Sequence, residues 1–244
     1  MKPFTLAVCW IALCLGHSAT ASLMVSPTWG DLTAEDQQKV TAGQLVELYR
    51  NYEGNSIVWP RSTFFKKIDA TPEEAVALFF DFNHHSDFLP FVLSSEILNE
   101  TGNSAEVDYK VTLPSFPYGL AQEGYTLNYR VNSYDHNNIY SVSWHMTRSG
   151  GFTGYSEGSF TAKPLVGGGT LVIYDQFAQP RSGMSSLVHQ HQVVEMEKVT
   201  QKVTALILFA RIEKEGALHS VLLSEQVQAL RQVLQSSSSN EYPF

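Results

Sequence analysis

Histidine and acidic residues gather at one point of the chain, shortly after a predicted helix. His84, His85 and Asp87 lie within four residues, in a polar turn that Pro90 ends. A histidine beside a carboxylate can act as a general base, so this turn is the first candidate for chemistry. The same residue types are also typical of a polar turn at the end of a helix. Both interpretations stay open.

The other reactive residues lack the spacing that their chemistry requires. His189 and His191 are two residues apart, which directs them to opposite sides of a helix, whereas metal sites on helices use spacings of three or four. The glycines at 167–169 have no Lys-Ser/Thr after them, as a phosphate-binding loop would. Asp175 lies in an apolar strand and is expected on its solvent face. We therefore predict no catalytic residue, no metal site and no cofactor.

Aromatic residues are abundant in the middle of the chain, where they alternate with polar residues. They are Tyr109, Tyr125, Tyr129, Tyr140, Trp144, Tyr155, Phe160 and Tyr174. An alternation of period two predicts strands with one apolar and one polar face, so Trp144 should face the core and His145 the solvent. Tyr and Trp combine apolar area with one polar group, which suits a pocket for a largely apolar ligand.

The predicted elements around these residues form one domain. A short helix from about Thr33 to Thr41 precedes a hairpin at 44–69, and a capped helix starts at Thr71 and runs to about Asn83. Five strands then form an antiparallel meander. We place them at residues 107–113, 125–131, 140–146, 155–163 and 170–177.

Residues 184–215 are predicted to form one long helix, because they contain neither Gly nor Pro and lie between Gly183 and Gly216. Apolar residues recur along this helix at spacings of three and four, and this stripe is expected to face the sheet. The stripe consists of Met196, Val199, Val203, Leu206, Ile207 and Ala210. A further amphipathic helix is predicted at 217–235, followed by a disordered tail at 236–244.

The first 21 residues have the pattern of a secretory signal peptide. A basic Lys2 precedes an apolar stretch at 4–15, and Ala-Thr-Ala at 19–21 is a cleavage site. Both cysteines, Cys9 and Cys14, lie in this segment, so the mature chain would have none. The net charge of −8, without a run of Lys or Arg, argues against nucleic acid as a partner. We expect a periplasmic or secreted protein.

Three segments, in this order, resemble the START-like, helix-grip superfamily, which includes polyketide cyclases, coenzyme Q-binding proteins and Bet v 1-type lipid-binding proteins. Residues 64–74 (FFKKIDATPEE) resemble its first strand and the start of its first helix. Residues 81–90 resemble the segment that follows this helix. Residues 157–164 and 169–174 resemble the hairpin before the closing helix. The matched region covers about 57–215.

The resemblance implies an α+β helix-grip fold, in which a curved antiparallel sheet wraps around the long C-terminal helix and leaves an apolar cavity between them. The domain would cover 22–235, with an N-terminal helix and hairpin at 31–56 outside the matched region. The residues expected to line the cavity are Tyr109, Tyr129, Tyr140, Trp144, Phe160, Val203, Leu206, Ile207 and Ala210.

An exported bacterial member of this kind would bind a lipid or another apolar small molecule for transfer or sequestration, with transient membrane contact. Two alternatives stay open. One is an enzyme of the cyclase/dehydratase type, with His84, His85, Asp87 or a pocket tyrosine as acid or base. The other is an accessory or structural module with a filled core. A continuous cavity would exclude the filled core, and a histidine or carboxylate facing it would favour the enzyme.

Overall fold

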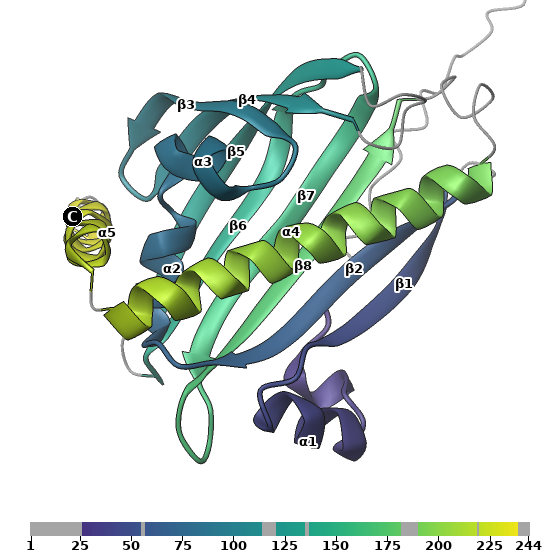
Figure 1. Cartoon of the computed structure of the whole chain (residues 1–244). Helices are drawn as coiled ribbons and strands as arrows, with labels where there is room; N and C mark the ends of the chain where they lie inside the picture. Colours follow the sequence, from purple (N-terminus) through teal and green to yellow (C-terminus); the bar gives the residue numbers. More distant parts are fainter. Residues whose placement is uncertain are drawn as a thin grey trace, which may run out of the picture.

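One curved, antiparallel sheet of eight strands organises the protein, and helix α4 crosses its concave face (Figure 1). The computed structural model describes residues 26–54, 57–113, 121–134, 137–181, 190–218 and 220–238. The strands lie in the order β1-β2-β8-β7-β6-β5-β4-β3. They are β1 (Val46–Gly54), β2 (Ile57–Ile68), β3 (Val92–Thr101), β4 (Ser104–Thr112), β5 (Gln122–Tyr134), β6 (Ile139–Arg148), β7 (Thr153–Pro164) and β8 (Thr170–Pro180).

The helices begin where the sequence supplies capping residues. In α2 (Pro72–Phe79), the Thr71 hydroxyl accepts from the Glu74 amide at 3.2 Å, and the Glu74 carboxylate accepts from the Thr71 amide at 2.7 Å. In α1 (Ala34–Thr41), Thr33 caps the first turn, and Gly43 follows the end with a φ of 81°. This left-handed φ favours glycine, because other residues meet steric strain there. The remaining helices are η1 (Trp29–Asp31), η2 (Phe82–His84), α3 (His85–Phe88), α4 (Gln190–Leu218) and α5 (Val221–Ser238).

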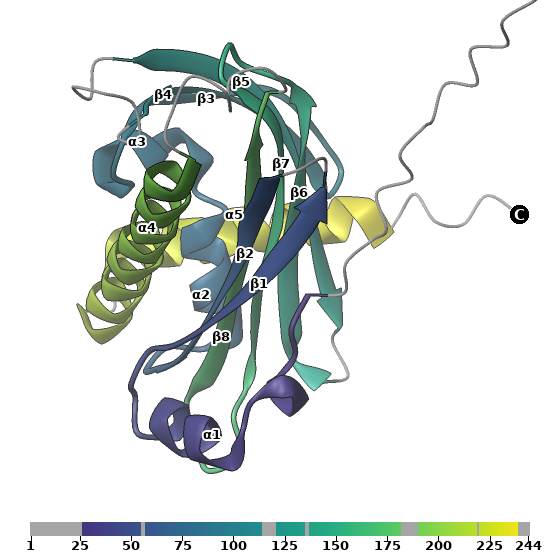
Figure 2. The ribbon, with the colours of Figure 1, turned by 90° about the vertical axis from the view of Figure 1, so that its right-hand side faces the viewer.

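Two apolar clusters lie on the two faces of the sheet. The larger one fills the concave face beneath α2, α3 and α4, and α5 packs on α2 at its edge (Figures 1 and 2). The smaller one lies on the convex face of β1, β2 and β8, where α1 covers it (Figure 2). Its buried residues are Leu32, Val40, Val46, Phe65, Leu171 and Ile173.

Helix α4 packs on the sheet with a face other than the one predicted. Met196, Val199, Leu206 and Ala210 are exposed, and Val203 and Ile207 are half-buried. The side chains that contact the core come from a second stripe, formed by Gln201, Ala205, Leu208, Phe209 and Ile212. The prediction that the first stripe faces the sheet is therefore wrong.

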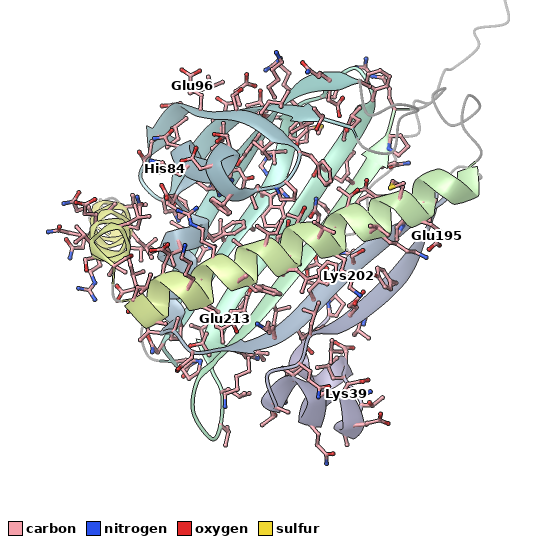
Figure 3. All side chains as sticks on the ribbon, in the orientation of Figure 1. Lys39, His84, Glu96, Glu195, Lys202 and Glu213 are labelled. Atoms are coloured by element: carbon pink, nitrogen blue, oxygen red, sulfur yellow. The ribbon has the colours of Figure 1, made fainter. Side chains whose placement is uncertain are left out.

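Ion pairs hold one edge of α4 beside β1 and β2. Lys202 pairs with Glu47, and Lys66 pairs with Glu213 at 2.5 Å. Figure 3 labels Lys202 and Glu213 along this edge. With this edge of the helix beside β1 and β2, its opposite edge faces α3.

The structure confirms the predicted fold, including the meander, the order of the elements and the opposite directions of Trp144 and His145. Strand β3 was not predicted. Its apolar residues do not alternate, since irregularities at Val92/Ser94 and Ile97/Asn99 shift the register. Helix α2 ends at Phe79, short of the predicted end at Asn83. No helix within the described ranges is long and apolar enough to cross a membrane.

Candidate functional site

A cavity of about 160 Å³ lies between the concave face of the sheet, α3 and α4. Strands β4, β5, β6 and β8 supply aromatic walls, and the connection from α3 to β3 forms a rim at Leu89, Pro90 and Phe91. Phe91 is partly exposed and has a φ of 70°, an uncommon backbone conformation for a bulky residue. The aromatic side chains that line the cavity are Phe79, Phe91, Tyr109, Tyr125, Tyr129, Trp144 and Tyr174.

Trp144 can form the floor of the cavity because a glycine lies opposite it. In the pairing of β6 with β7, Trp144 faces Gly158. A Cβ atom at Gly158 would lie 2.2 Å from Cζ2 of the indole and 2.3 Å from the Asp175 carbonyl oxygen. Any other residue at 158 would push the indole away. The ring instead packs against Tyr129 and Tyr174, with centroids 5.8 Å away in both cases.

A chain of hydrogen bonds links His85 to two tyrosines of the sheet. His85 is buried, and Nε2 lies 2.9 Å from the Phe79 carbonyl oxygen, so Nε2 donates. Burial lowers the pKa of His85 to about 4, which leaves Nδ1 without a proton at neutral pH. The Tyr109 hydroxyl, 2.8 Å away, therefore donates to Nδ1. Tyr129 then donates to Tyr109 across 3.0 Å.

This chain has two chemical consequences. Both ring nitrogens of His85 are engaged with protein groups, so the histidine has no free position for a ligand proton. The Tyr129 hydroxyl already donates a hydrogen bond to Tyr109, so its oxygen can only accept a further hydrogen bond. A donor on a bound molecule is the partner that Tyr129 lacks.

Helix α4 contributes three polar residues to the cavity, spaced at three and four positions. Thr200 donates to the Met196 carbonyl oxygen and Thr204 to the Thr200 carbonyl oxygen, both at 2.9 Å. Glu197 accepts from Nε2 of Gln201 at 2.8 Å. Burial raises the pKa of Glu197, and the bond from Gln201 partly opposes this effect. Like Tyr129, both threonine hydroxyls retain only accepting positions.

Strands β5 and β8 complete the polar lining. The Tyr174 hydroxyl donates to Oε1 of Gln176 at 2.6 Å, which leaves the amide group of Gln176 able to donate. Glu123 is buried and accepts from the amides of Phe152 and Thr153 at 2.9 and 3.0 Å. Burial, and then the charges of Glu123 and Glu197, raise the pKa of Tyr125. Both carboxylates therefore act on the same phenol.

The predicted lining residues separate into two groups. Tyr109, Tyr129 and Trp144 do line the cavity. Phe160 lies behind it, stacked on Phe79 at 4.6 Å, and Tyr140 packs against the edge of the core. Val203, Leu206, Ile207 and Ala210 do not line it, because they belong to the outward stripe of α4. Whether any of these residues binds a ligand stays a prediction.

The histidine turn does not bring His84, His85 and Asp87 together, as the general-base interpretation would require. His84 is exposed and pairs with Asp81 at 2.6 Å, and Asp87 is exposed. Only His85 faces the cavity. His189 and the side chain of His191 lie outside the described residues, among which no group of three His, Cys, Asp or Glu side chains could hold a metal ion.

Sequence reasoning missed the polar half of the cavity, which includes Glu123, Ser156, Gln176, Glu197, Thr200 and Thr204. A signal for the helical part was present. Glu197, Thr200 and Thr204 repeat at spacings of three and four between the two apolar stripes of α4. A polar row flanked by apolar residues on both sides is typical of a helix edge that meets a cavity.

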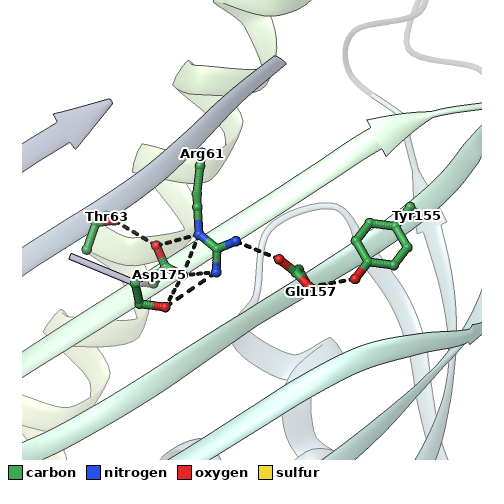
Figure 4. A network of polar contacts seen from close by, with 6 residues as sticks. Arg61, Thr63, Tyr155, Glu157 and Asp175 are labelled. Carbon is green, nitrogen blue, oxygen red and sulfur yellow. Dashed lines mark hydrogen bonds and ion pairs between the residues drawn. The ribbon is translucent and has the colours of Figure 1, made fainter. Parts of the chain in front are cut away.

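A second buried polar cluster lies on the convex face of the sheet (Figure 4). The Arg61 guanidinium contacts the Asp175 carboxylate through Nε and Nη2, at 2.9 and 2.5 Å, and Glu157 at 2.6 Å. Thr63 and Ser26 donate to Asp175 at 2.7 and 2.9 Å. Asp175 is thus on the face that the alternation predicted, but it is buried rather than solvated.

Solved structures share this architecture. The STAR-related lipid transfer protein fragment from Xanthomonas axonopodis has a TM-score of 0.57 at 17% identity, over 69% of this chain and 93% of that chain. Human StAR-related lipid transfer protein 5 has a TM-score of 0.53 at 11% identity, over 76% and 92%. The di-domain ARO/CYC protein BexL has a TM-score of 0.50 at 8% identity, over 74% and 53%.

These likenesses show that the chain has the START-like helix-grip fold. No protein-family model matches the sequence, and no curated protein matches it closely enough to count as a relative. The fold is shared by proteins whose names indicate lipid transfer and by proteins whose names indicate cyclase activity. An activity must therefore be argued from the cavity itself.

Proposed function

We propose that the protein binds a small, largely apolar molecule in the cavity beneath α4, and that it transfers or sequesters this molecule rather than converting it. The observation that carries the proposal is the cavity of about 160 Å³ with aromatic walls. A packed core has few voids larger than a water molecule. The lipid transfer proteins with the same fold agree with such a role.

The size of the cavity limits the ligand. Pockets for drug-sized ligands measure about 300–1,000 Å³, and a cavity of about 150 Å³ in another protein holds one benzene molecule. The part of the ligand inside this cavity is therefore about as large as one ring or a short chain. A longer lipid would extend past the rim at Leu89–Phe91 or require the rim to move.

The engagement of the histidine favours binding over catalysis. A general base needs a free nitrogen within hydrogen-bond reach of the substrate, and both nitrogens of His85 already bond to Phe79 and Tyr109. The cyclase/dehydratase alternative would use Glu197, the carboxyl group at the cavity with a raised pKa, or a pocket tyrosine such as Tyr125, whose hydroxyl can still donate. Turnover of a bound ligand that stops in a Glu197→Gln variant would favour that alternative.

Binding can be tested by blocking the cavity from the helix. We expect benzyl alcohol to shift the backbone amide NMR signals of residues 109, 129 and 144 in the parent protein. Thr204→Phe, which fills the cavity, should abolish these shifts, whereas Ala210→Phe on the outward face of α4 should keep them. Urea unfolding of both variants checks that they fold. Shifts that persist unchanged in a folded Thr204→Phe protein would place the binding elsewhere.

We also propose that the protein acts after export, on the basis of the signal-peptide pattern at residues 1–21. N-terminal sequencing of the protein from the periplasm or medium should then begin at Ser22. Recovery of the chain in the cytosol with Met1 in place would contradict export, while leaving the ligand-binding proposal untouched.

A further inference from the structure

The charges around the cavity are all of one sign. Glu123 and Glu197 line it, and no Lys or Arg does so among the described residues. The two longer internal segments that the structure does not describe, residues 114–120 and 182–189, contain no Lys or Arg in their sequence. A ligand with a carboxylate or phosphate group would enter this cavity without a counter-charge. Burying an unpaired anion is strongly unfavourable.

Glu197 and Glu123 differ in how far their oxygens are already used. Glu123 accepts from the Phe152 and Thr153 amides and from the Thr153 hydroxyl, so it has a structural partner on each oxygen. Glu197 accepts one bond, from Gln201 to Oε1, and its Oε2 accepts none within the described part of the chain. Burial raises the pKa of Glu197, which means that its ionised form lacks solvation that a nearby cation would replace.

Four hydroxyl groups around the cavity can only accept a further hydrogen bond. Tyr129, Tyr174, Thr200 and Thr204 each already donate to a protein acceptor, so their oxygens can bind only a donor. The groups that can still donate are all neutral: the Gln176 amide, the Tyr125 and Ser156 hydroxyls and the Trp144 indole N–H. A ligand ammonium group is therefore matched by these acceptor oxygens and by Glu197, whereas the neutral donors do not offset the charge of an anion.

The aromatic walls favour the same sign of charge. Tyr129, Trp144 and Tyr174 form a continuous surface with centroids 5.8 Å apart. The faces of aromatic rings carry negative partial charge and attract cations. The same rings also provide apolar area for a small hydrocarbon body.

We infer that the cavity takes a small amine with an aromatic or short aliphatic body, that its ammonium group pairs with Glu197, and that carboxylates are excluded. The inference rests on the proposed function, because it assigns a chemical class to the ligand of the same cavity. Glu197 is then the residue that determines which charge the ligand carries.

Three probes of similar size separate the effect of charge from the effect of size. Benzylamine, benzyl alcohol and benzoate share one ring and differ in the charge of the substituent. Calorimetric titration at pH 7 should show benzylamine binding at least tenfold more tightly than benzyl alcohol, with no detectable binding of benzoate. Glu197→Gln should weaken benzylamine at least tenfold and leave benzyl alcohol within twofold of the parent.

A matched variant on the same helix controls for loss of surface charge. Glu195 is exposed and pairs with Lys198 on the edge of α4 beside β1, where Lys198 lies over the Tyr49 ring and Figure 3 labels Glu195. Glu195→Gln should change neither affinity. If benzyl alcohol binds and benzylamine binds no more tightly, or if benzoate binds equally well, the inference is wrong and the proposed function stands. If none of the three probes binds the folded parent protein, the proposed function fails as well.

Discussion

Two neighbouring residues of β8 belong to two different kinds of buried polar cluster. Asp175 points to the convex face, where Arg61, Thr63 and Ser26 all contact its carboxylate. Gln176 points to the concave face, where it lines a cavity whose polar groups can still form further hydrogen bonds. One strand therefore carries a cluster in which the charges are paired and another in which they are not.

The difference separates polar groups that maintain the fold from polar groups that await a ligand. Buried polar groups in proteins are almost always hydrogen-bonded, and the convex cluster follows this rule with contacts of 2.5–3.1 Å between Arg61 and Asp175. The concave cluster combines hydroxyl groups that already donate to protein acceptors, an ionisable Glu197 and empty space. We expect substitutions in the first cluster to affect stability and substitutions in the second to affect binding.

The largest expected effect is on the convex face. Asp175→Ala leaves the Arg61 guanidinium, only 6% exposed, without its main partner. Breaking a buried ion pair costs about 3–5 kcal/mol, so the free energy of unfolding in urea should fall by that amount. Benzyl alcohol binding should be unchanged in the folded fraction.

An exposed pair of the same residue types provides the control for Asp175. Asp108 pairs with Arg148, with side chains 35% and 59% exposed. Asp108→Ala should cost about 1 kcal/mol or less, because solvent screens exposed pairs. Equal losses in the two variants would mean that burial does not distinguish the convex cluster.

A smaller effect is expected from His85, through pH. Its pKa falls from 6.5 to about 4 on folding, so the unfolded chain takes up a proton in this interval and the folded chain does not. Stability should therefore fall as the pH is lowered from 7 to 5, by about 2 kcal/mol from this group. In His85→Gln, which can keep both hydrogen bonds, the free energy of unfolding in urea should lose this pH-dependent contribution. An identical pH dependence in the two proteins would contradict the buried, neutral histidine.

Glu197 should have the opposite pH dependence and little effect on stability at neutral pH. Its pKa is raised on folding, so ionisation above the unfolded pKa costs stability, and this cost disappears as the pH falls. Glu197→Gln should be at least as stable as the parent at pH 7, with the difference shrinking toward pH 4.5. A clear loss of stability in the glutamine variant at pH 7 would indicate that Glu197 maintains the fold.

The fold could be predicted because its signals are local. The alternation in β4 to β8 places one residue type on each face, and the Thr71-Pro72 start of α2 satisfies the first turn of the helix. Strand β3 lacks both kinds of signal. It lies at the edge of the sheet with bulges that break the alternation, so its strand character depends on pairing with β4.

The rotation of α4 could not be predicted, because this helix carries two apolar stripes on opposite sides. Met196, Val199 and Val203 have the same spacing as Ala205, Leu208 and Ile212, and periodicity does not choose between them. Tertiary burial decides, because Leu208, Phe209 and Ile212 pack into the core on the concave face of the sheet. The cavity-lining residues predicted on α4 were wrong for the same reason.

The smallest expected effect on stability is in the outward stripe of α4. Leu206 is 42% exposed, so Leu206→Ala should change the free energy of unfolding by about 0.5 kcal/mol or less. Phe209 is fully buried, and Phe209→Ala should cost about 3–5 kcal/mol. Urea unfolding compares them directly. A large loss at Leu206 would show that the outward stripe is covered in solution.

The aromatic half of the site could be anticipated from Tyr109, Tyr129 and Trp144, because strand alternation directs all three to one face. The hydrogen-bonding roles of the polar half could not be anticipated, since they depend on which hydroxyl groups already donate to protein acceptors. That Tyr129 only accepts follows from the contact of His85 with the Phe79 carbonyl, 50 residues earlier than Tyr129 itself. No pattern within one element contains that information.

Native mass spectrometry of the protein isolated from its own compartment shows whether the cavity beneath α4 holds a small molecule. We expect an added mass on the parent protein and on Ala210→Phe, and none on Thr204→Phe. Tandem fragmentation should release a compound with a basic nitrogen. An added mass that persists on a folded Thr204→Phe protein, or its absence from the parent together with no uptake of benzyl alcohol, would contradict binding in this cavity.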